Sequence, residues 1–102
     1  MILENGYQMQ TTFIRDFAIA NRFGVFAIVD TFDRALKEWR NNIVYMTELV
    51  IATNRFIWYF YEKGNHGLAE VYDRLWRQAE QAVYENKNFT PEDMHFFYET
   101  TD

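Results

Sequence analysis

The sequence predicts an all-α fold, a compact bundle of about five helices, and three observations lead to this prediction. Apolar residues recur every three or four positions, and no long segment alternates with a period of two. Gly24 and the cluster Gly64-Asn65-His66-Gly67 provide clear breaks. Leu, Ile, Val and Phe make up about 27% of the 102 residues, above the share typical of disordered chains. We therefore expect a single helical domain over 1–102, with 1–10 as a loosely ordered N-terminal segment.

The first helix is expected from Phe13 to Phe23. Thr11 or Thr12 can accept a hydrogen bond from the free amides of its first turn. Gly24 suits the left-handed conformation that ends many helices.

The second helix is expected from Val25 to Arg40. Its apolar residues are three and four positions apart, and acid-before-base pairs lie on the opposite side. This spacing predicts one buried face made of Val25, Ile28, Val29, Phe32, Leu36 and Trp39.

The third helix, from Ile43 to about Lys63, is unusual because its apolar residues surround the whole helix. Of the 19 residues from Ile43 to Tyr61, 14 are apolar or aromatic. Such a helix is typically packed on several sides by others, and we expect it at the centre of the bundle. A self-association or partner interface is the main alternative. A membrane span is disfavoured by Glu48, Asn54 and Arg55, since ionised groups are costly inside a bilayer. Glu48 and Arg55 are expected to mark a solvated stripe or an interface ion pair.

The fourth and fifth helices complete the bundle. The fourth is expected from about Leu68 to Asn86, after a turn at Gly64-Asn65-His66-Gly67, with one apolar stripe along its length. The fifth opens with Thr90-Pro91-Glu92-Asp93, which supplies a capping hydroxyl, a proline at the first helical position and two acids near the positive end of the helix dipole.

The formal net charge is −5, and the acidic excess lies at the C-terminal end. From Asn88 onward the chain has four acids and no Lys or Arg: Glu92, Asp93, Glu99 and Asp102. Binding to a phosphate backbone normally needs a clustered basic face, so we expect no direct nucleic-acid contact. We expect Glu92, Asp93 and Glu99 instead to steer a basic protein partner, an effect that salt would weaken.

The residues that usually carry chemistry are scarce. The chain has no Cys and no Ser, and its two histidines, His66 and His95, match no metal-binding spacing. No glycine-rich phosphate loop occurs. We therefore expect no catalytic residue, no cofactor and no metal ion, and a cytoplasmic protein that does not bind membranes. Glu48 is the one carboxylate expected to be partly buried, and so the best candidate for a raised pKa.

Aromatic residues make up 20% of the chain, more than so small a core ordinarily needs. Tyr and Trp are favoured anchors of protein interfaces. The candidate partner-binding residues are Trp58, Tyr59 and Tyr61 of the third helix. Trp39 and Trp76 are alternatives if their faces are exposed.

Several blocks of the chain resemble a group of small, uncharacterised helical proteins carried by phage-like or conjugative elements of gut-dwelling anaerobes. The blocks that carry the resemblance include Thr11-Thr12-Phe13, Asp30-Thr31-Phe32, Thr47-Glu48-Leu49-Val50, Leu75-Trp76 and Phe96-Phe97-Tyr98. The resemblance covers nearly everything after Gln10. It implies an accessory protein of a mobile element and gives no activity or functional residues.

The sequence thus favours a non-enzymatic interaction protein that binds a protein partner and self-associates. Within the same class, the alternative is an anti-defence inhibitor of a host restriction or CRISPR nuclease. The alternative from another class is a small enzyme or ligand carrier that uses Glu48 inside an aromatic pocket. That hypothesis predicts an enclosed cavity beside Glu48.

Overall fold

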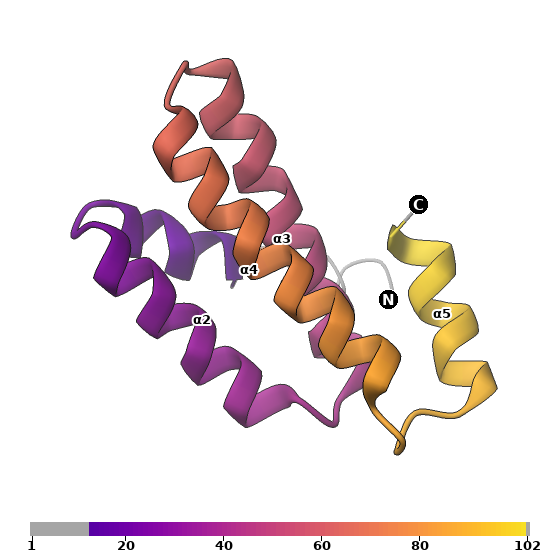
Figure 1. Ribbon diagram of the computed structural model, residues 1–102. Coiled ribbons are helices and arrows are strands. Elements are labelled where there is room, and N and C mark those ends of the chain that lie inside the picture. The colour runs from indigo at the N-terminus through magenta and orange to yellow at the C-terminus, as the bar shows by residue number, and fades with distance from the viewer. Residues whose placement is uncertain (1–12, 102) are drawn as a thin grey trace.

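The computed structural model describes residues 13–101, and this part of the chain consists of helices joined by short turns, without a strand (Figure 1). The predicted all-α bundle of five helices is confirmed. Its elements are a helix over 13–21, α2 (Val25–Trp39), α3 (Ile43–Glu62), α4 (His66–Glu85) and α5 (Pro91–Thr101). The segment 1–10 and the caps expected at Thr11 or Thr12 lie outside the described residues.

Two glycines allow the chain to turn between helices. Gly64 has a φ of 76° and ends α3, as predicted. Gly24 has a φ of 107° and a ψ of −172°, so it is not the left-handed helical cap that the sequence suggested. This extended conformation with positive φ is open almost exclusively to glycine. The helix over 13–21 ends two residues before Phe23, because the amides of Arg22 and Phe23 bond to carbonyl groups three residues back and not four. α2 starts directly after Gly24.

Asparagine side chains cap the two long helices. Asn42 Oδ1 accepts a hydrogen bond of 3.1 Å from the Tyr45 amide at the start of α3. Asn65 Oδ1 accepts one of 3.1 Å from the Leu68 amide, so α4 begins at His66, two residues earlier than expected.

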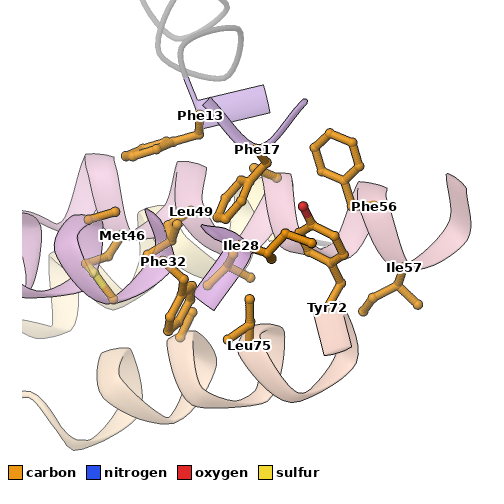
Figure 2. Packing of buried hydrophobic residues seen from close by; sticks show 14 of the residues in the cluster. Phe13, Phe17, Ile28, Phe32, Met46, Leu49, Phe56, Ile57, Tyr72 and Leu75 are labelled. Atoms are coloured by element: carbon orange, nitrogen blue, oxygen red, sulfur yellow. The ribbon is translucent and has the colours of Figure 1, made fainter. Parts of the chain in front are cut away.

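The central position predicted for the third helix is confirmed. α3 packs against α2, α4 and α5, and α3 and α4 form a long antiparallel hairpin (Figure 1). All five residues from Met46 to Val50 are buried, so this part of α3 is covered on every side. Phe17, from the helix over 13–21, lies among Leu49, Phe56 and Tyr72 (Figure 2), and its ring meets the Tyr72 ring edge-on at 5.5 Å.

Two expectations about individual side chains are wrong. Val25 is predicted on the buried face of α2, but it is 48% exposed, because it is the first residue of the helix, directly after the Gly24 turn. The solvated stripe expected at Glu48 is wrong, because this side chain is only 6% exposed and neighbouring elements cover α3 on every side at that level. The partial burial that was also expected for the Glu48 carboxylate is confirmed, and an interface ion pair of this residue stays a prediction. Arg55, two turns later, is exposed.

Candidate protein-binding surfaces

The aromatic residues proposed from the sequence are exposed, but they divide between two sides of α3. Trp58 is 59% exposed, and its ring stacks on that of Tyr61 with 5.9 Å between centroids. Tyr61 also meets the His66 ring edge-on at 5.0 Å. Tyr59 instead contacts Phe56 and has the Lys63 ammonium 5.2 Å from its ring centroid. Trp58 and Tyr61 therefore form one surface, and Tyr59 belongs to another.

The two alternative tryptophans are half-buried. Trp39 stacks on Tyr45 with 3.9 Å between ring centroids and packs against the core, so its contacts are mainly internal. Trp76 also packs against the core, and part of it lines a surface depression described below. Neither side chain projects from the molecule as Trp58 does.

Among the residues that the structure describes, the most exposed apolar side chains lie at the turn between the helix over 13–21 and α2. Phe26 is 92% exposed and Phe23 is 76% exposed, and half-exposed Ile19 and Val25 lie beside them in sequence. We call Ile19, Phe23, Val25 and Phe26 the tip patch. This turn lies at the N-terminal end of α2, away from the turn that joins α3 and α4 (Figure 1).

The tip patch was not predicted from the sequence, although the sequence contains a signal for it. Residues two apart on a helix differ by about 200° in direction, so Phe26 points away from buried Ile28. It lies on the polar side of α2, the side that carries the exposed Asp30–Arg34 ion pair. A large apolar residue on the polar face of an amphipathic helix is the pattern that would have identified it.

Two shallow depressions follow one side of the α3–α4 hairpin. One, of about 350 Å³, is lined by Ile57, Tyr61, His66, Ala69, Glu70 and Asp73. The other, of about 230 Å³, is lined by Val50, Ile51, Asn54, Arg55, Trp76, Glu80 and Thr100, the last of these from α5. Partial burial raises the pKa of Glu80, and the nearby charge of Arg77 opposes this shift.

Two acids of the C-terminal end, Asp93 and Glu99, contact residues in or next to α5. Thr90 and Asp93 form a reciprocal capping pair, in which the Thr90 amide donates to Asp93 Oδ2 at 2.9 Å and the Asp93 amide donates to Thr90 Oγ1 at 3.2 Å. His95 Nε2 lies 2.9 Å from Glu99 Oε1. Glu92 is exposed. Of the three acids expected to steer a partner, Asp93 therefore has a structural role as a cap.

Glu48 is the buried carboxylate that the sequence predicted, and Thr47 beside it is buried as well. The two depressions on the hairpin, and a third bounded by Arg40, Asn41, Ala82, Glu85, Asn86 and Lys87, are lined by other residues. Use of Glu48 in catalysis or ligand binding stays a prediction.

Within residues 13–101, no three His, Cys, Asp or Glu side chains converge as a metal ion would require. No helix in this range combines the length and the apolar character needed to cross a membrane. A comparison of the chain with protein-family models, with curated proteins and with solved structures found no match.

Proposed function

We propose that this chain is a non-enzymatic interaction module whose tip patch inserts into an apolar pocket of a protein partner. The observation that carries the proposal is the exposure of Phe26 and Phe23, at 92% and 76%. Burial of one phenylalanine side chain is worth about 1.5–3 kcal/mol. Two such residues on one turn therefore form an effective anchor for a partner, of the kind that dominates interface energetics.

A protein is a better candidate than a lipid surface for this patch. The segment 13–30 contains two bases, Arg15 and Arg22, and two acids, Asp16 and Asp30, so its net charge is zero. Attraction to anionic lipid depends on clustered Lys and Arg near the inserting residues. The tip patch has the apolar residues of a membrane anchor without this basic cluster.

The resemblance to proteins of mobile elements supplies a setting for the proposal. In that setting the chain is a cytoplasmic accessory protein, and its partner is encoded by the host or by the element. The anti-defence hypothesis is one form of this proposal, in which the partner is a component of a restriction or CRISPR nuclease.

Affinity capture with a matched pair of variants tests the proposal. The immobilised wild-type chain, the double variant Phe23→Ser/Phe26→Ser and the control Tyr98→Ser, which alters a half-exposed ring on α5, are each incubated with lysate of a gut anaerobe. We expect a protein that the wild type and the control retain in stoichiometric amount and the double variant loses. If the protein that only the double variant loses is a component of a nuclease, this result would support the anti-defence hypothesis.

Two results would contradict the proposal. One is equal retention of every captured protein by the double variant. The other is co-sedimentation of the wild type, but not of the double variant, with vesicles of anionic phospholipid, because this would assign the tip patch to a membrane surface.

A further inference from the structure

A second exposed surface runs along α3 and is separate from the tip patch. Ile51, Arg55, Trp58 and Glu62 are spaced at i, i+4, i+7 and i+11, so they lie within about 60° of one another around the helix. Ile51 is half-buried and the other three are exposed. We call these four residues the α3 stripe. On a helix, the stripe points away from Leu49, Phe56 and Phe60, which are buried in the core.

The charges of the α3 stripe have no ion-pair partner within residues 13–100. Three exposed arginines, on α2 and α4, are paired with acids one turn away: Arg34 with Asp30, Arg74 with Glu70 and Arg77 with Asp73. The residues four positions before and after Arg55 are Ile51 and Tyr59, and those around Glu62 are Trp58 and His66. None of these four is an acid that could pair with Arg55 or a Lys or Arg that could pair with Glu62. No ion pair of Arg55 or Glu62 occurs in this part of the chain.

The order of the residues in the stripe is self-complementary. A two-fold interface places the same patch of both copies together, so each charge must face its opposite at an equal distance from the axis. The midpoint between Arg55 and Glu62 falls between Trp58 and Tyr59. An antiparallel pair of α3 helices with its axis at this point would therefore set Arg55 of each copy opposite Glu62 of the other.

We propose that a second copy of this chain occupies the α3 stripe and that the protein is a two-fold symmetric dimer. Two Trp58 rings lie at the centre of this interface, and two Arg55–Glu62 ion pairs lie at its ends. A foreign helix could also cover the stripe, but its charges would have to match both Arg55 and Glu62. A second copy of this chain carries the matching acid and base at the required spacing.

Trp58 is suited to this central role because its ring is exposed and stacks on a neighbouring ring of the same helix. The stacking of Trp58 on Tyr61, at 5.9 Å and an interplanar angle of 23°, limits the freedom that the side chain must give up on binding. Central tryptophans surrounded by polar residues are the usual hot spots of protein interfaces. Pairing through the stripe leaves the tip patch free, so a dimer would present two tip patches.

Sedimentation equilibrium of the full chain, over a wide concentration range, tests the proposal. We expect the wild type to approach twice the 12.4 kDa chain mass as concentration rises. Arg55→Glu and Glu62→Arg each place like charges opposite one another at both ends of the interface, so each should weaken dimerisation by roughly tenfold or more. The double variant Arg55→Glu/Glu62→Arg restores opposite charges and should bring the dissociation constant back to within about threefold of the wild type.

Arg34→Glu is the matched control, because it reverses another exposed arginine, on α2 and outside the stripe. We expect it to dimerise as the wild type does. Circular dichroism of each variant verifies that the helices are intact. A wild type that stays monomeric at the highest concentration would overturn the proposal. Single reversals that dimerise normally, or a double variant as weak as the single ones, would overturn the assignment of the interface to the stripe.

Discussion

Tyr72 is the largest of the fully buried side chains, and its hydroxyl donates a hydrogen bond to Asn21 Oδ1. This bond ties α4 to the helix over 13–21, and the ring stacks on Phe56 at 5.0 Å. Tyr72→Phe keeps the ring and removes the bond, so we expect a loss of about 0.5–1.5 kcal/mol in unfolding free energy at pH 7. Urea denaturation measures it. Tyr98→Phe, at a half-exposed position on α5, should leave the stability unchanged.

The same tyrosine predicts a dependence of stability on alkaline pH. Burial raises the pKa of Tyr72 above its ordinary value of 10.0, and the hydrogen bond to Asn21 only partly offsets this shift. The protonated Tyr72 side chain therefore contributes fully to the free energy of unfolding below the unfolded-state pKa. This contribution is lost as the pH rises above that pKa toward the higher pKa of the folded state. We expect the stability advantage of the wild type over Tyr72→Phe to shrink above about pH 10. An advantage that grows with pH in this range would contradict this account.

Two glycines should respond to alanine in opposite directions. Gly24 has a φ of 107° with no atom within 4 Å of an added Cβ, so Gly24→Ala meets no clash but forces a strained backbone. We expect a loss of about 1–3 kcal/mol. Gly67 lies in the first turn of α4, and its added Cβ would make an ordinary contact at 3.7 Å with Asn65 Oδ1. Gly67→Ala should raise stability by about 0.5–1 kcal/mol, and thermal unfolding of both variants provides the comparison.

At the scale of the element, α5 depends on its N-terminal cap and on one buried ring. Phe97 is fully buried and meets the Tyr84 ring edge-on at 5.6 Å, which fastens α5 to α4. Thr90→Ala removes the hydroxyl that accepts from the Asp93 amide and should cost about 1 kcal/mol. Amide hydrogen exchange should show the loss of protection concentrated in α5. A uniform loss across all helices would contradict the local role of this cap.

The existence of the helices was predictable, and most boundaries fell within two residues of the expected ones, because local signals lie at the helix ends. Asn42, Asn65 and Thr90 each cap the helix that follows, and Gly64 allows the turn that ends α3. The direction of the chain at Gly24 was not predictable, because many combinations of φ and ψ are open to glycine. That direction leaves Val25 exposed, and because it was not predictable, the helical period alone wrongly predicted Val25 in the core.

The candidate surfaces depend on tertiary packing and were therefore only partly predictable. Trp58 and Tyr61 were identified from aromatic excess alone, and both are exposed. The same criterion suggested Trp39, but its stacking on Tyr45 involves a different helix, which composition does not show. The exposure of Phe26 was not predicted, because the helical period identifies the buried face of α2 and says nothing of a single apolar residue on its polar face.

The whole molecule combines a small core with two exposed surfaces on different helices. α3 supplies the centre of the core and, on its outer side, the α3 stripe. The tip patch lies on the turn before α2 and contributes almost nothing to the core, because Phe23 and Phe26 are mainly in solvent. Phe23→Ser/Phe26→Ser should therefore change the unfolding free energy by no more than about 0.5 kcal/mol. A large loss of stability in urea denaturation would show that these rings serve the fold.

Site-specific photo-crosslinking in cells shows whether the tip patch contacts a protein partner. A photoreactive phenylalanine analogue at position 26 places the reactive group on the most exposed apolar side chain, and the same analogue at exposed Lys37 of α2 serves as the control. We predict a discrete adduct with one foreign protein from position 26, identified by mass spectrometry, and none from position 37. No adduct from position 26, or the same adducts from both positions, would contradict the account.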